Sequence, residues 1–205
     1  MTGSGDLAAL LSRPILDVAP RLLGAELRHG TVAVRITEVE AYDGASDPGS
    51  HAARGRTARN AVMFGPPGRL YVYFTYGMHH CCNVVCGSEG TAAAVLLRAG
   101  EVTDGLDLAR SRRPTARVDR DLARGPARLC RALDLDRRHN GADLTAEPVT
   151  FVPAPSPVPP QMVRSGPRVG LRRAAERPWR FWVDGAASVS TYRPALDLSR
   201  QRGTG

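Results

Sequence analysis

The sequence contains no lysine: all 28 basic residues among its 205 positions are arginine. Mechanisms that need a lysine amine are therefore excluded, among them a lysine Schiff base, a pyridoxal phosphate anchor and the lysine of a Walker A loop. With 20 acidic residues the net charge is +8 and the pI is about 10.1. Because guanidinium groups pair with phosphate as a rigid fork, this excess indicates a polyanionic partner.

Long apolar runs and a disulfide framework are also missing. No run approaches the ~20 residues of a membrane span, and the first residues lack the basic-then-apolar pattern of a signal peptide. Three of the four cysteines are crowded at Cys81, Cys82 and Cys86, which is not the spacing of a disulfide scaffold. We therefore expect a cytoplasmic protein with reduced thiols and no membrane partner.

Residue patterns predict a mixture of strands and short helices. Alternating and β-branched residues predict strands at 32–36, 70–74, 81–85, 92–97 and 181–183, and a helix capped by Asp17 is expected to end at Gly24, with others at 105–113 and 126–133. Residues 153–160 hold five prolines and predict an extended loop. Since the 45 residues after that loop are few for an independent core, we expect one domain over 12–193, with a flexible tail at 1–11 and another at 194–205.

Two glutamates lie at the end of the first of these strands. Alternation places Val32, Val34, Ile36, Glu38 and Glu40 on one strand face, so the carboxylates continue an apolar stripe. A carboxylate buried in this way is costly to desolvate and suits a general base. The alternative is that the strand leaves the core after Ile36 and that both glutamates are hydrated.

Tyrosines and cysteines gather around the predicted hairpin. Four of the five tyrosines lie at 42, 71, 73 and 76, and Tyr76 stands beside Gly77 at the expected turn. Aromatic side chains on a strand and at an exposed tip suit stacking on nucleic-acid bases, whereas core packing is the simpler explanation for Tyr71. His79, His80 and the three neighbouring cysteines invite a zinc hypothesis, but adjacent strand residues point to opposite faces, which favours buried small side chains instead.

Short motifs follow one another in a fixed order: residues 38–42, His51, 59–60, 63–64, 68–73, 76–78, Asn83 and 96–98, then 125–130 and 168–170. In this combination the chain resembles the alkyladenine (3-methyladenine) DNA glycosylase family, in its monofunctional mammalian and bacterial form, from about Leu16 to Val189. The resemblance implies a single-domain α/β (α+β) fold, with a curved antiparallel sheet, surrounding short helices and a protruding β-hairpin that enters the DNA minor groove.

The resemblance also implies roles for individual residues. Glu40 corresponds to the general base that activates a water against C1′, and Arg98 and the backbone carbonyl of Val169 correspond to groups that hold this water. Tyr76 corresponds to the wedge that fills the gap left by the extruded base. The remaining roles are those of the base pocket (Tyr42, His51, Tyr73 and Asn83, with Asn83 clashing with the amine of normal guanine) and of DNA contact (Thr57, Arg59, Met78 and Arg128).

The implied activity is hydrolysis of the N-glycosidic bond of alkylated or deaminated purines in double-stranded DNA, by a monomer without metal or other cofactor. Without a lysine amine, strand cleavage by a lyase step is not expected. A non-catalytic binder of damaged or bent DNA is the alternative, and the pairing of Glu40 with Arg98 argues against it. His79, His80 and the turn at 65–68 depart from the family pattern, so they bear on substrate range.

Overall fold

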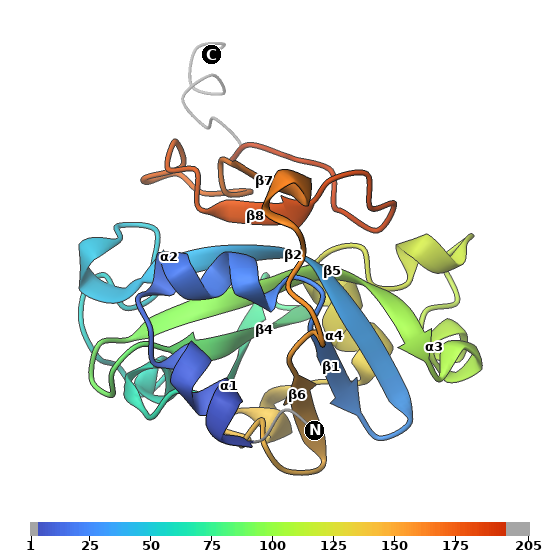
Figure 1. The fold of residues 1–205 in the computed structure, drawn as a ribbon, viewed down its shortest axis with the longest axis horizontal. Coiled ribbons are helices and arrows are strands. Elements are labelled where there is room, and N and C mark those ends of the chain that lie inside the picture. The colour runs from blue at the N-terminus through green and yellow to red at the C-terminus, as the bar shows by residue number, and fades with distance from the viewer. Residues whose placement is uncertain (1–3, 196–205) are drawn as a thin grey trace.

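The computed structural model describes residues 4–195, which form a single α+β domain around a curled antiparallel sheet (Figure 1). In these residues the sheet has eight strands, with β3, β4, β5, β2, β1 and β6 as neighbours in that order, while β8 pairs with β2 and β7. The strands are β1 (Glu26–His29), β2 (Val32–Asp43), β3 (Leu70–Thr75), β4 (His79–Cys86), β5 (Ala93–Asp104), β6 (Val149–Val152), β7 (Val163–Gly166) and β8 (Arg180–Val183). The expected fold class is confirmed.

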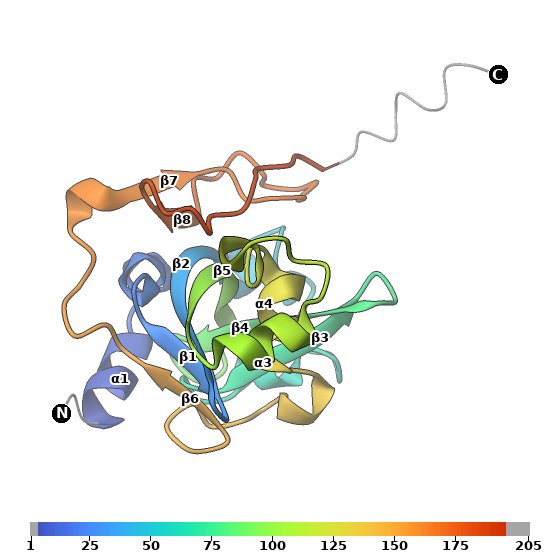
Figure 2. The same cartoon turned by 90° about the vertical axis from the view of Figure 1, so that its right-hand side faces the viewer.

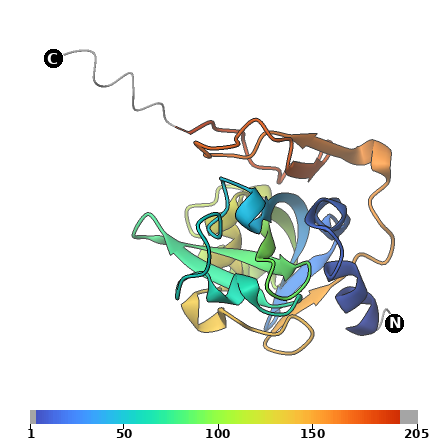
Figure 3. The ribbon, with the colours of Figure 1, turned by 90° about the vertical axis from the view of Figure 1, so that its left-hand side faces the viewer.

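The helices are short and surround the sheet. The α-helices are α1 (Ser4–Leu11), α2 (Ile15–Val18), α3 (Leu106–Arg112) and α4 (Pro126–Leu133), and single 3₁₀ turns lie at Ala19–Leu22, Gly44–Ser46, Ala61–Phe64, Asp119–Asp121, Arg137–His139 and Pro160–Met162. In Figure 3, α1 and α2 lie at the opposite end of the molecule from the turn between β3 and β4. Within residues 4–195 no helix has the length and apolar character that a membrane crossing requires.

The predicted N-terminal tail is wrong wherever the structure describes it. Ser4–Leu11 forms helix α1, and both Leu7 and Leu11 are buried in the main core. The segment forms a helix because its apolar side chains are buried against the rest of the domain, and this packing stabilises the helix. Residues 1–3, and residues 196–205 of the predicted C-terminal tail, lie outside the described residues. The next helix begins at Ile15 after Pro14, so Asp17 lies within its first turn and is not its cap.

The prediction that Glu38 and Glu40 continue the core-facing stripe of β2 is wrong. The register between β2 and β5 shifts on both sides of Glu38, so Val39 and Ala41, and not Glu38 and Glu40, join Ile36 in the main core. The hydration alternative is wrong as well, because both glutamate side chains are 0% exposed. Gly100 allows the strands to approach here, since a Cβ at this position would lie 2.5 Å from the carbonyl oxygen of Arg35.

The two faces of the sheet have different neighbours. Tyr71 pairs with Asn83 and Asn83 with Leu96, so the side chains of these three residues share one face. Val84, Val95 and Leu97 belong to the other face, which packs into the main core. We call the first the pocket face. Tyr71 and Tyr73 share it, as expected, while Cys81 lies on it and Cys82 lies in the core.

A C-terminal segment, residues 163–190, packs against the rest of the domain. It includes β7 and β8, and Figures 1 and 2 show it as a layer along one side of the remaining chain. Its β8 pairs with β2 through Glu38, Val39 and Glu40. The sequence patterns did not predict β1, β6 or β7, each of which has only four residues. The predicted helix at 126–133 is confirmed with its bounds.

Candidate active site

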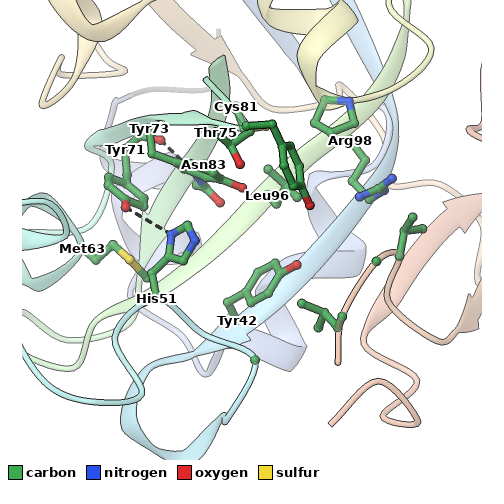
Figure 4. A pocket seen from close by; sticks show the side chains of 16 residues that line it. Tyr42, His51, Met63, Tyr71, Tyr73, Thr75, Cys81, Asn83, Leu96 and Arg98 are labelled. Carbon is green, nitrogen blue, oxygen red and sulfur yellow. Dashed lines mark hydrogen bonds between the residues drawn. The ribbon is translucent and has the colours of Figure 1, made fainter. Parts of the chain in front are cut away.

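A pocket of about 310 Å³ opens between the pocket face of the sheet, the loop after β2 and the C-terminal segment. Such a volume lies in the range of small-ligand sites. Four tyrosines and His51 contribute to its walls, and Figure 4 shows Tyr42 on one side and Tyr71, Tyr73 and Asn83 on the other. The full lining is Tyr42, Gly49, His51, Met63, Tyr71, Tyr73, Thr75, Tyr76, Cys81, Asn83, Leu96, Arg98, Pro126, Val169, Gly170 and Leu171.

The aromatic side chains of the pocket hold one another in place. The rings of Tyr71 and Tyr73 stack with centroids 5.6 Å apart, and His51 meets the Tyr73 ring edge-on at 4.5 Å. The Nδ1 atom of His51 lies 3.3 Å from the hydroxyl of Tyr71, and Asn83 donates from Nδ2 to the carbonyl oxygen of Tyr71 at 3.1 Å. Tyr42 also lines the pocket and, with Tyr71 and Tyr73, supplies most of its aromatic surface.

Burial alters the ionisation of these walls. Desolvation, reinforced at Tyr42 by the nearby Glu40, raises the pKa of Tyr42 and of Tyr73 well above the ordinary tyrosine value. Desolvation and the charge of Arg59 lower the pKa of His51, so its imidazole is neutral at pH 7. Burial raises the pKa of Cys81 to about 11, and this thiol is therefore protonated at neutral pH. The tyrosine, histidine and cysteine side chains of the pocket are therefore uncharged at neutral pH, and Arg98 is the charged residue of the lining.

Glu40 lies beneath these walls with both carboxylate oxygens engaged. Its Oε1 accepts the backbone N–H of Val169 at 2.6 Å, and its Oε2 accepts the hydroxyl of Tyr42 at 2.9 Å and Nη1 of Arg98 at 3.3 Å. The site therefore unites Glu40, Arg98 and Val169, as the sequence predicted, although the contact from Val169 is made by its amide. The predicted role of the Val169 carbonyl stays a prediction.

A second buried glutamate shares the same arginine. Glu38 accepts Nε of Arg98 at 3.1 Å and Nε of Arg180 at 2.6 Å, and the backbone N–H of Ser190 at 2.7 Å. We call Glu38, Glu40, Arg98 and Arg180 the glutamate–arginine cluster. Desolvation opposes the charged form of Arg98, but Glu40 and Glu38 outweigh it and raise the pKa of this arginine. The negative charges of the two carboxylates and the positive charges of the two guanidinium groups therefore compensate one another in the interior of the protein.

Another buried ion pair anchors the segment that carries Val169. Arg168 donates to both oxygens of Asp47 and to the carbonyl oxygen of Ala41, and both side chains of the pair are 0% exposed. The guanidinium also lies 4.7 Å from the centroid of the Tyr42 ring. Burial alone would raise the pKa of Asp47, but hydrogen bonds from Arg168 and from the amide of Gly49 lower it below the usual value. The pair fixes both Val169 and Tyr42.

The hairpin tip is the most exposed part of the site. Tyr76 is 83% exposed, Met78 is 68% exposed, and in Figure 2 the turn between β3 and β4 extends away from the body of the domain. Tyr76 and Gly77 have φ angles of +52° and +68°, the pattern of a type I′ turn. A tyrosine in the left-handed region is strained, and such strain is concentrated at functional positions.

The other predicted DNA-contacting residues are also exposed. Thr57 and Arg59 lie in the loop that supplies His51, and the guanidinium of Arg59 lies 5.7 Å from the centroid of the Tyr73 ring. Arg128 is exposed in the first turn of α4, beside Pro126 of the pocket. The basic stretch around it is only partly free: Arg110 pairs with Asp107 and Asp119, and Arg113 is 7% exposed.

The thiols form no cluster with a donor set for a metal. All four cysteines are free and buried, which confirms the expectation of buried small residues. Within residues 4–195 no group of three or more histidine, cysteine, aspartate or glutamate side chains is arranged to hold a metal ion.

Sequence reasoning missed several residues that support the site: Asp47, Arg168, Arg180 and Ser190. Arg168 and Asp47 lie more than a hundred positions apart, and no local pattern marks either of them. The one available signal was that Arg168 directly precedes a predicted site residue, Val169.

The fold and the site together define a protein with a tyrosine-rich pocket whose lining residues Tyr42, Arg98 and Val169 bind a buried carboxylate, next to an exposed hairpin. A concave pocket with apolar and aromatic walls and a few convergent polar groups is typical of a small-molecule binding or active site. A family model described as methylpurine-DNA glycosylase matches residues 9–187. The chain therefore belongs to the methylpurine-DNA glycosylase family.

Curated relatives support this membership along most of the chain. A protein of Streptomyces avermitilis is 59% identical over 190 residues, with 89% of each chain covered, and one of Frankia casuarinae is 56% identical over 192 residues, with 89% and 90% covered. A protein of Burkholderia lata is 50% identical over 184 residues, with 89% of each covered. All three are provisionally named 3-methyladenine DNA glycosylases.

Proposed function

We propose that this protein is a monofunctional DNA glycosylase that releases alkylated or deaminated purines, including 3-methyladenine and hypoxanthine, from double-stranded DNA. The observation that carries the proposal is the position of Glu40, fully buried beneath an aromatic pocket and held by Tyr42, Arg98 and Val169. A protein that only bound damaged DNA would gain nothing from burying this carboxylate, which is costly to desolvate.

Recognition begins with the exposed residues. The protein approaches DNA from the minor groove as a monomer, and Tyr76 enters the stack where the damaged nucleotide leaves it. Extrusion costs a few kcal/mol and less at a damaged pair, and stacking of Tyr76 on the neighbouring bases offsets part of this cost. Arg59, Arg128, Thr57 and Met78 contact the DNA independently of its sequence. The bacterial relatives make nucleoid DNA in the cytoplasm the expected substrate.

The extruded purine lies between Tyr42 and Tyr73. Electron-poor alkylated bases gain from stacking on these rings. The neutral imidazole of His51 hydrogen-bonds the edge of the base, and Asn83 stands where it would clash with the exocyclic amine of a normal guanine. The tyrosines are neutral at pH 7, and desolvation raises their pKa further, so they discriminate by shape and hydrogen bonding.

Hydrolysis uses a water held by Glu40. A carboxylate has about four lone-pair sites, and the structure fills three of them on Glu40, which leaves one for a water. The water oxygen attacks C1′ as the bond to the purine nitrogen breaks; the purine leaves with the bonding electrons, and Glu40 accepts the proton. Arg98 and the carbonyl of Val169 orient the water. The products are an abasic site and the free base.

A panel of duplexes, each with one lesion, tests the proposal by the appearance of abasic sites. We expect release from at least one alkylated or deaminated purine and none from undamaged duplex. Binding without release from any lesion would favour the non-catalytic alternative. With no lysine in the chain, borohydride should trap no covalent DNA adduct, and a trapped adduct would contradict the monofunctional mechanism.

A further inference from the structure

Glu38 is a buried carboxylate to which the proposed reaction gives no role. Its side chain is 0% exposed and lies in the glutamate–arginine cluster, while the proposed water is held by Glu40. Besides its contacts with Arg98 and Arg180, it accepts the hydroxyl of Ser190 at 3.0 Å. A charged group buried at this cost beside a catalytic pair calls for an explanation.

Arg98 is fixed by a different partner at each of its nitrogens. Nε donates to Glu38 at 3.1 Å, Nη1 to Glu40 at 3.3 Å and Nη2 to the hydroxyl of Ser190 at 3.3 Å. Because a guanidinium group is planar, three contacts in three directions determine its orientation. Arg98 therefore meets Glu40 through one nitrogen only, although arginine commonly binds a carboxylate through two parallel hydrogen bonds.

The number of contacts on Glu40 makes this restraint important. Three donors already occupy its oxygens, and a second hydrogen bond from Arg98 would take the site left for the water. If Glu38 lost its charge, Arg98 would be left with Glu40 as its sole carboxylate and would turn toward it. Such a bidentate pair would be stable but would exclude the water.

We infer that Glu38 is a positioning residue, which holds Arg98 in an orientation that keeps one lone pair of Glu40 free for the attacking water. The inference rests on the proposed function. Glu38 acts through Arg98 and does not touch the substrate. The competing explanation is purely structural: Glu38 also holds Arg180 and Ser190, and so attaches the C-terminal segment to β2.

The test is Glu38→Gln, measured by single-turnover base release and by affinity for abasic-site DNA. We expect the release rate to fall about 10- to 100-fold, the scale of a small misplacement in an active site. Affinity should stay unchanged, because the DNA-contacting residues are not disturbed. The same substitution at Glu26, a partly buried carboxylate of β1 outside the pocket, is the matched control and should leave the release rate unchanged.

A second variant separates positioning from structural support. Arg180→Lys keeps the charge opposite Glu38 but loses the hydrogen bond from Nη2 of Arg180 to the carbonyl of Ser190, which is 3.0 Å long. Positioning predicts that, for the same loss of thermal stability, the release rate of this variant falls less than that of Glu38→Gln. If both variants lose rate in proportion to lost thermal stability, the positioning role is wrong, and it is equally wrong if Glu38→Gln releases base as fast as the wild type.

Ser190→Ala decides the question should Glu38→Gln not fold. It removes the hydroxyl that accepts Nη2 of Arg98 and donates to Glu38, and it keeps the backbone N–H that Glu38 accepts. A several-fold slower release with unchanged affinity supports the inference, and an unchanged rate overturns it. A wild-type protein that releases no lesion base overturns the proposed function itself and this inference with it.

Discussion

Two parts of the proposed site differ in how firmly the fold holds them. Glu40 is 0% exposed and accepts three hydrogen bonds from three separate parts of the chain, whereas Tyr76 is 83% exposed at the end of a strained turn. The buried carboxylate keeps its geometry before any DNA arrives. The exposed tyrosine makes little contact with the rest of the protein.

In the proposed mechanism, this difference separates the groups that carry out the chemistry from the groups that recognise DNA. Groups that act on the reacting atoms need a fixed geometry, and here the glutamate–arginine cluster and the Asp47–Arg168 pair supply it. Groups that replace an extruded base need a large free surface, and the hairpin tip supplies that. Substitutions in the buried part should therefore affect rate or stability, while substitutions at the exposed part should affect affinity.

The largest expected effect is that of Glu40→Gln. Glutamine retains the shape of the side chain but cannot accept the proton of the water, so release of hypoxanthine or 3-methyladenine should slow by about 10³-fold or more. Binding to lesion-containing duplex should survive, which fluorescence anisotropy can measure. If this variant releases base at a rate near that of the wild type, Glu40 is not the general base, and the buried part of the site does not carry out the reaction.

Asp47→Asn should cost stability. It leaves the charge of Arg168 buried without its carboxylate, and breaking a buried pair in this way costs about 3–5 kcal/mol. Urea denaturation measures the free energy of unfolding. Asp184→Asn, which breaks an exposed pair with Arg164, is the control and should cost no more than about 1 kcal/mol. Equal losses of unfolding free energy in the two variants would show that the Asp47–Arg168 pair contributes no more stability than the exposed Asp184–Arg164 pair.

The pH dependence of this pair has a definite sign. The pKa of Asp47 in the folded protein lies below its ordinary value. Its contribution to stability is therefore complete above about pH 4 and disappears as the pH falls through the folded-state pKa. Asp47→Asn should flatten the loss of stability on acidification, and an unchanged acid profile would contradict the assignment.

At the hairpin, Tyr76→Ala should weaken binding to abasic-site DNA by about tenfold, the value of one aromatic stacking contact. The thermal stability of the free protein should not change, because the side chain has little contact with the core. Tyr76→Phe keeps the ring and is the matched control, with affinity near that of the wild type. If Tyr76→Ala destabilises the protein and leaves DNA affinity intact, the tip is structural and the comparison fails.

The sequence predicted the exposed part better than the buried one. Tyr76 and Gly77 form the expected turn because the signal for a hairpin is local: a glycine at the turn between two strand patterns. The helix at Pro126–Leu133 was predicted for the same reason, since proline at the first position marks its start. Both features depend on neighbours in the chain.

The buried part depends on contacts between distant residues. Simple alternation put Glu38 and Glu40 on the core face, and the irregular register opposite Gly100 reversed that assignment. No local pattern marks such a shift, and none joins Glu38 to Ser190 across 152 positions. The resemblance to a family predicted Glu40, Arg98 and Val169, but not the pairs that hold them.

The smallest expected effect concerns the exposed arginines. It tests whether they bind DNA together with Tyr76. Arg128→Gln should reduce the slope of log affinity against log salt concentration by about 0.9, because one phosphate contact and its released counterion are lost. Arg110→Gln is the control: this arginine lies in the same basic stretch but is paired with Asp107 and Asp119, so the slope should not change. An equal loss in both variants would mean that net charge alone attracts DNA. A loss confined to Arg128 would mean that the fold selects which arginines grip the backbone, by pairing the others with carboxylates.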